Sequence, residues 1–205
     1  MTKLKKRLCN RFRGFLPVVI DVETAGFNPE KDALLELAAV ILESDEEGNL
    51  YRKQTFHRHI LPFPGANLEQ RCLDFTGIDP YHPFRFAVTE TEAIREMLQV
   101  VRQELKASQC HRAILVGHNS FFDLSFIKAA IKRSKIKRDP FHSFSSIDTV
   151  SLSAVMLGQT VLARATTAAG IAFSQEEAHS ALYDAEKTAD LFCLLVNRWQ
   201  KLTDL

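Results

Sequence analysis

The stretch Phe-Leu-Pro-Val-Val-Ile-Asp-Val-Glu-Thr, residues 15–24, decides the fold of this chain. Phe15 to Val22 is apolar and rich in β-branched residues, which predicts a buried strand. Asp21 and Glu23 stand at its end, two positions apart, so their side chains point to the same face. Two carboxylates at the edge of an apolar element are costly unless a positive group lies beside them. Taken alone, a polar strand end in solvent would explain the pair equally well.

Two more strands are predicted directly after the first. Leu34 to Glu43 is a second apolar run, Ser44 to Asn49 is an acidic turn with a glycine, and Leu50 to Ile60 alternates well enough for a third strand. The second and third strands therefore form a hairpin. Residues 61–83 hold four prolines and two glycines, which predicts a loop region with a short helix at Leu68 to Phe75.

The second half of the chain alternates helices with short strands. The expected elements are a helix at Thr89 to Ala107, a strand at Ala113 to Val116, a helix at Phe122 to Lys132, a strand at Phe144 to Ile147, a helix from Asp148 or Thr149, and a long helix from Ser180 to Leu202. This order predicts an α/β fold with a mixed sheet and helices on both faces. The length suits a single domain over residues 1–205.

Two further motifs supply candidate site residues. Asp123 ends the run Gly-His-Asn-Ser-Phe-Phe-Asp behind the predicted strand, where a helix-capping role would also explain an aspartate. His179 precedes Asp184 by five positions, and Ser180 is the expected N-cap of the last helix. His179 then lies on the preceding loop, and Asp184 lies one turn inside the helix. His118 has the same spacing to Asp123, so the spacing alone does not choose between the two histidines.

The candidate residues together indicate metal-dependent chemistry on a phosphate ester. Four carboxylates from separate places in the chain, Asp21, Glu23, Asp123 and Asp184, predict two divalent cations, because Mg²⁺ and Mn²⁺ prefer oxygen ligands. Two such ions about 3.5–4 Å apart can clamp an in-line phosphoryl displacement. A neutral histidine, with a reference pKa of about 6.5, suits the removal of a proton from the attacking water.

Basic residues are clustered, although the net charge is only +1. A solvated face explains any one cluster, and phosphate binding is the better interpretation only if the clusters flank a site that works on nucleic acid. The clusters are Lys3, Lys5, Lys6, Arg7, Arg11 and Arg13; Lys132, Arg133, Lys135, Lys137 and Arg138; and Lys106 with Arg112.

The cysteines and the apolar runs bear on location. The four cysteines are scattered and form no C-x-x-C pair, which predicts reduced thiols in a cytoplasmic protein and signals neither a zinc site nor a disulfide framework. No apolar run approaches the ~18–20 residues needed to span a bilayer, so no membrane partner is expected.

The three acidic motifs, in this order and spacing, resemble those of the DEDDh exonucleases. That superfamily has a ribonuclease H-like fold and a two-metal site. Longer stretches, among them Gly-Ile-Asp-Pro, Lys-Arg-Asp-Pro-Phe-His and Ala-His-Ser-Ala-Leu-Tyr-Asp, resemble one bacterial group of the superfamily from near the N-terminus to Trp199. The resemblance implies a homodimeric 3′→5′ exoribonuclease. It would trim single-stranded 3′ ends of structured RNAs, including transfer RNA and ribosomal RNA precursors, and would also degrade single-stranded DNA.

The resemblance also implies roles for residues. Asp21 would bridge two Mg²⁺ ions, with Mn²⁺ as an alternative. Glu23 and Asp184 would bind one ion, Asp123 would support the other partly through water, and His179 would be the base. Phe27, Phe75, Phe122 and Phe144 would stack on terminal bases, which tolerates any base because each has a π-face. The basic residues implied to face the partner subunit's active site are Arg11, Arg13, Lys106, Arg112, Lys137 and Arg138.

One residue departs from the family pattern. Arg71 stands four positions before Phe75, where the pattern has an acid, so any discrimination against terminal cytosine through that acid is in doubt.

Two other functions are compatible with part of the pattern. A proofreading subunit of a DNA polymerase would share the motifs, but the basic clusters and the extent of the match argue against it. A non-catalytic RNA-binding dimer would not need all five catalytic residues.

Overall fold

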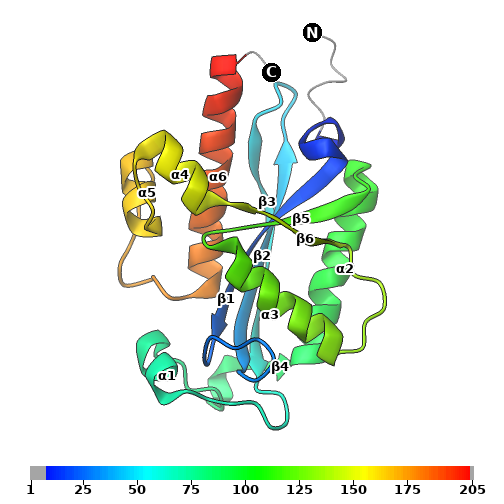
Figure 1. Ribbon diagram of the computed structural model, residues 1–205, viewed down its shortest axis with the longest axis vertical. Helices are drawn as coiled ribbons and strands as arrows, with labels where there is room; N and C mark the ends of the chain where they lie inside the picture. The colour runs from blue at the N-terminus through cyan, green and yellow to red at the C-terminus, as the bar shows by residue number, and fades with distance from the viewer. Residues whose placement is uncertain (1–7, 204–205) are drawn as a thin grey trace.

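The structure is a computed structural model that describes residues 8–203, and its centre is one six-stranded mixed sheet (Figure 1). The strand order is β4-β3-β2-β1-β5-β6. Neighbours β1, β2 and β3 pair antiparallel, whereas β5 pairs parallel with β1 and with β6, and β4 pairs parallel with β3. The strands are β1 (Phe15–Thr24), β2 (Leu34–Ser44), β3 (Leu50–Leu61), β4 (Val88–Thr89), β5 (Arg112–Gly117) and β6 (Phe141–Asp148).

Helices cover both faces of this sheet, as predicted. Figure 1 shows α6, with α4 and α5 beside it, on one face, and α2 with α3 on the other. The helices are α1 (Gln70–Thr76), α2 (Glu90–Ser108), α3 (Ser120–Arg133), α4 (Thr149–Leu157), α5 (Leu162–Ala169) and α6 (Ala181–Thr203), with short 3₁₀ turns at Leu8–Asn10, Phe12–Gly14 and Pro83–Arg85. None of the helices within residues 8–203 is long and apolar enough to cross a membrane.

Three predicted elements differ from the observed ones. The sequence predicts a helix after β6 without a division, but Gly158, in the left-handed region at φ 66°, ends α4 and a separate α5 follows. The last strand begins at Phe141 rather than Phe144, because the β5–β6 pairing includes an irregular stretch that hydropathy does not show. The first strand continues to Thr24, so Asp21 and Glu23 lie within it.

The core explains why the acidic face of β1 is held firmly. Strand β2 is buried on both sides over its first nine residues, as expected for a strand covered by α6 on one face and α2 on the other. In β1, Ile20 and Val22 are buried, while Asp21 and Glu23, which alternate with them, are half-buried on the other face. The carboxylates therefore stand on a rigid strand beside the start of α6. The basic residues Lys3, Lys5, Lys6 and Arg7 lie outside the described residues.

Candidate active site

Strand β1 and helix α6 bring three carboxylates together. Asp21 and Glu23 share one face of β1, and Asp184 reaches them from the first turn of α6. One oxygen from each of the three groups lies within 4.8 Å of the others. Residues from opposite ends of the chain thus form one compact acidic site.

Helix α3 adds the fourth carboxylate, Asp123. Its side chain is only 4% exposed, and its Oδ1 accepts a hydrogen bond of 3.1 Å from the backbone N–H of Val22. The N-cap of α3 is Asn119, so the capping role left open for Asp123 is wrong. Gly117 makes the approach of α3 feasible, because a Cβ at this position would lie 3.0 Å from Asp123 Oδ2.

The electrostatics of the site fit divalent cations. Burial, followed by the charges of Asp123 and Glu23, raises the pKa of Asp21 well above its usual range. Burial and the neighbouring Glu36 and Asp184 raise the pKa of Glu23 to about 8. Burial also raises the pKa of Asp184, whose Oδ1 is buried and has no hydrogen-bond partner among the described residues. Clustered carboxylates with an unsatisfied oxygen fit a hard divalent cation, because such ions prefer oxygen ligands.

His179 lies beside this cluster, on the loop before α6, as predicted. It adopts the left-handed region at φ 67°, and its backbone N–H donates a hydrogen bond of 3.1 Å to Asp184 Oδ2. The imidazole is exposed, and its ring centroid lies 4.4 Å from that of Phe75. Ser180 directly precedes α6, but its hydroxyl lies 3.5 Å from Glu36 Oε1.

His118, the other histidine with an aspartate five residues later, is placed differently. Its Nδ1 lies 2.9 Å from Thr149 Oγ1, and its Nε2 lies 3.0 Å from the carbonyl oxygen of Thr160. Burial lowers the pKa of His118. Both ring nitrogens are therefore engaged in joining the end of β5 to α4 and to the segment between α4 and α5, which leaves neither available to water at the site.

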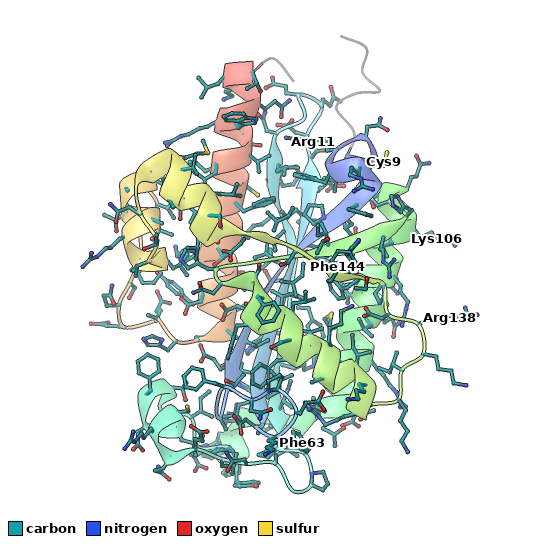
Figure 2. The ribbon with its side chains drawn as sticks, viewed as in Figure 1. Cys9, Arg11, Phe63, Lys106, Arg138 and Phe144 are labelled. Atoms are coloured by element: carbon teal, nitrogen blue, oxygen red, sulfur yellow. The ribbon has the colours of Figure 1, made fainter. Side chains whose placement is uncertain are left out.

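An aromatic hollow opens next to the carboxylates. Phe27, Phe75 and Phe122 line a space of about 420 Å³ together with Glu23 and Arg71. Phe27 is 76% exposed and Phe75 is 68% exposed, so their rings offer open faces. The fourth predicted stacking residue, Phe144, is not in this lining; it is exposed on β6 (Figure 2), and its ring is nearly perpendicular to that of His142.

Comparisons with known proteins show the family to which this chain belongs. The RNase T domain family, described as "Exonuclease", matches residues 18–192. A ribonuclease T of Marinobacter nauticus is 60% identical over 195 residues, covering 95% of this chain and 88% of the relative. The corresponding protein of Vibrio vulnificus is 57% identical over 196 residues, covering 95% and 90%. The chain belongs to the ribonuclease T family.

Solved structures show the same fold. Escherichia coli exonuclease I in complex with a dT13 oligonucleotide superposes with a TM-score of 0.69 at 20% identity, over 93% of this chain and 43% of that one. Cell-death related nuclease 4 gives a TM-score of 0.64 at 17% identity, over 90% of this chain and 65% of that one. Family membership makes the protein a divalent-metal-dependent 3′→5′ exonuclease of single-stranded nucleic acid.

The basic residues that the ribonuclease T resemblance singles out lie apart from the carboxylates. Figure 2 shows Lys106 and Arg138 on the side of α2, and Arg11 toward the end of the sheet opposite α1. Arg11 is half-buried and donates a hydrogen bond of 2.7 Å to the carbonyl of Gly48, while Arg112 Nε donates to the carbonyl of Phe141. Arg11 and Arg112 therefore also brace the fold.

One buried carboxylate beside the acidic cluster is not predicted from the sequence. Glu36 on β2 is 4% exposed and pairs directly with Glu23 across the strands. A single charged residue inside the apolar run Leu34–Leu42 was the available signal. Its position beside the site depends on the register between β1 and β2, which the sequence does not state.

Proposed function

We propose that this protein is an exoribonuclease that trims the single-stranded 3′ ends of structured RNAs, including transfer RNA and ribosomal RNA precursors, and also degrades single-stranded DNA. The observation that carries the proposal is the acidic cluster of Asp21, Glu23 and Asp184, with Asp123 behind it, next to an open aromatic hollow. A hollow of this kind needs an unpaired base, because a paired base cannot present its faces for stacking.

Two Mg²⁺ ions would be held by Asp21, Glu23, Asp123 and Asp184, and when bound they would neutralise the charge that develops on the phosphate and the leaving 3′-oxygen. Asp21 would serve both ions, because it lies within the cluster with Glu23 and Asp184, and the charge of Asp123 also acts on it and raises its pKa. His179, exposed beside Asp184, would accept the proton of the attacking water at its imidazole.

The aromatic side chains would position the 3′ end of the nucleic acid. Phe27, Phe75 and Phe122 surround the hollow that adjoins Glu23, so they would hold the terminal bases beside the carboxylates. Phe144 projects from β6 outside this hollow and would contact a base further from the 3′ end of the nucleic acid. The contact between Phe75 and His179 links base binding to the orientation of the proposed proton acceptor.

The same proposal includes a homodimer in the cytoplasm. Lys106 and Arg138 lie on the side of α2, at a distance from the start of α6, so they would serve substrate bound at the partner subunit's site (Figure 2). Arg11, Arg13, Arg112 and Lys137 belong to the same proposed surface. Scattered cysteines without a C-x-x-C pair support a reducing compartment.

The test is digestion of transfer RNA and of short RNA and DNA oligomers, with the 3′ end free or blocked, in the presence of Mg²⁺. We expect stepwise shortening from free 3′ ends only, with faster turnover on RNA. Asp21→Asn should abolish activity while the protein stays folded, and calorimetry should show about two Mg²⁺ per chain in the parent only. Unchanged Mg²⁺ binding in Asp21→Asn would contradict the bridging role. A preference for DNA together with a tightly bound polymerase would favour the proofreading alternative.

A further inference from the structure

Glu36 is a buried carboxylate on the same face of the sheet as the proposed metal ligands. It lies on β2, and its Cα partner on β1 is Glu23. Directly paired residues of antiparallel strands have Cβ atoms about 4.5–5.5 Å apart on one face. The Glu36 side chain is therefore the immediate neighbour of Glu23 across the strands.

Hydrogen-bond donors hold Glu36 in this position. His57 Nε2 lies 2.6 Å from Glu36 Oε1, and the hydroxyl of Ser180 lies 3.5 Å from the same oxygen. Arg85, which donates to the carbonyl of Leu35 at 2.8 Å, brings a guanidinium to the adjacent residue of β2. A carboxylate at 4% exposure is costly to bury, and such donors offset part of that cost.

The cluster could be mistaken for a separate metal site. Ligand atoms of Glu36, His57 and His59 lie within 4.8 Å of one another. However, the 2.6 Å separation of Glu36 and His57 is that of a hydrogen bond. Arg85 Nη2 lies 3.4 Å from His59 Nδ1, and because a guanidinium only donates, it engages the lone pair that a metal would need. A cation at this position would also be repelled by Arg85.

We propose that Glu36 is a fifth carboxylate of the active site, which binds no metal itself but strengthens the binding of divalent cations by its charge across the strands from Glu23. The proposal rests on the ligand set given under the proposed function. The electrostatics of the neighbouring groups agree with this proposal. Among the charges that raise the pKa of Glu23, that of Glu36 has the largest effect, and it also raises the pKa of Asp21 and of Asp184.

The substitution Glu36→Gln separates charge from shape. The amide oxygen of the introduced glutamine can still accept from His57 and Ser180, so the local hydrogen bonds remain. Without the negative charge, the apparent Kd for Mg²⁺ should rise about tenfold or more, which is about 1.4 kcal/mol. The metal-free protein should be as stable as the parent or more stable, because one repulsion between carboxylates is removed.

The experiment combines calorimetric Mg²⁺ titration with thermal unfolding in EDTA and in Mg²⁺, on the full chain. For Glu36→Gln we expect a raised Kd for Mg²⁺, an unchanged or higher Tm in EDTA, and a smaller gain in Tm on adding Mg²⁺. Glu43→Gln is the matched control, since it removes the same charge from the other end of β2, where Glu43 accepts from Tyr51, and it should leave the Kd unchanged.

Several outcomes would overturn the proposal. A Kd for Mg²⁺ equal to that of the parent would show that the charge of Glu36 does not act on the site. A lower Tm in both EDTA and Mg²⁺, with unchanged Kd, would assign Glu36 to stability alone. Glu36→Ala removes the charge by a second route and must also raise the Kd, and failure of both variants to fold would equally reject the proposal. Absence of Mg²⁺ binding in the parent would instead reject the proposed function.

Discussion

The backbone N–H of Val22 donates a hydrogen bond of 3.1 Å to Asp123 Oδ1, across 101 positions of the sequence. This bond joins the strand that carries Asp21 and Glu23 to the helix that carries Asp123. The close approach depends on Gly117, whose missing side chain leaves room for Asp123 Oδ2 and for the backbone of Ser120.

Gly117→Ala should therefore lower turnover while the protein still folds. Its Cβ would lie 3.0 Å from both Asp123 Oδ2 and Ser120 Cα, so α3 must shift. A displacement of about 1 Å at a catalytic group can cost about 10²-fold in rate, and the shift needed here is a few tenths of an ångström, so we expect a loss smaller than 10²-fold. Steady-state kinetics with circular dichroism would measure this. Gly65→Ala strains the backbone at φ 81° but adds its methyl group in open space, so it is the control for a loss of stability alone and should leave kcat unchanged. An unchanged kcat in Gly117→Ala would show that the position of α3 is not critical.

Metal-free protein should lose stability as pH rises. The pKa of Glu23 is about 8 in the folded protein against an ordinary 4.5, so folding takes up a proton between these values. The resulting stability is fully present below about pH 4.5 and is lost as pH rises through about 8. We expect Tm in EDTA to fall across this window, and Mg²⁺ to reduce the fall by favouring the ionised form. Glu23→Gln should flatten the profile in EDTA. A Tm that rises with pH in EDTA would contradict the expectation.

His179, and not His118, should be the proton acceptor. His179→Ala should reduce kcat by ~10²–10⁴, the usual contribution of a positioned base, with RNA binding nearly unchanged. His118→Ala should mainly lower Tm, because His118 contacts Thr149 and the carbonyl of Thr160. Single-turnover kinetics and thermal unfolding of both variants decide the assignment. It is wrong if a folded His118→Ala protein shows the larger loss of turnover.

Arg71 should make the enzyme tolerant of a terminal cytosine. Arg71 lines the hollow one helical turn before Phe75, and its guanidinium offers only donors. Cytosine carries the acceptors O2 and N3 beside its N4 amino donor, so Arg71 does not exclude it, and we expect kcat/KM for terminal cytosine to be no lower than for the other bases. Arg71→Glu introduces the acid that the family pattern has at this position, so kcat/KM for terminal cytosine should fall about tenfold relative to the other bases, which is about 1.4 kcal/mol. Arg71→Gln is the control without a negative charge. If the ratio of kcat/KM between terminal bases is the same in Arg71→Glu as in the parent, Arg71 has no role in base recognition.

Mixed dimers should restore activity if the basic surface serves the partner subunit. One subunit carries Asp21→Asn, and the other carries alanine at Arg11, Arg13, Lys106, Arg112, Lys137 and Arg138. Each homodimer should be nearly inactive. The mixed dimer should recover about half of the parent activity, because one complete site remains in a two-fold assembly. Each lost phosphate contact should also reduce, by about 0.7, the steepness with which the logarithm of the single-strand binding constant falls with the logarithm of the salt concentration.

The mixed-dimer experiment has a direct negative outcome. If mixed dimers form but stay inactive, the basic surface works within its own subunit or has no role in binding. Because Arg11 and Arg112 also bond to backbone carbonyls, the alanine variant needs a check of folding by circular dichroism. A variant limited to Lys106, Lys137 and Arg138 avoids this structural cost.

The sequence by itself determined five of the six strands, the main helices and the candidate catalytic positions as a set of motifs, but not the two-residue strand β4. Local information was enough, because a strand displays residues i and i+2 on one face and apolar periodicity marks the buried elements. The common orientation of the Asp21 and Glu23 side chains follows directly from this rule. The position of His179 before α6 follows from the same kind of local pattern, a serine followed by a helical run.

Only the tertiary structure decided which distant groups meet. The register between β1 and β2 places Glu36 beside Glu23, and a shift of one residue would have turned it to the other face. The packing of α3 turns Asp123 from a plausible cap into a buried acceptor for Val22. His118 and His179 have identical spacing to an aspartate, yet only packing engages both nitrogens of the first and exposes the second. Such contacts depend on long-range geometry, and no local pattern in the chain encodes them.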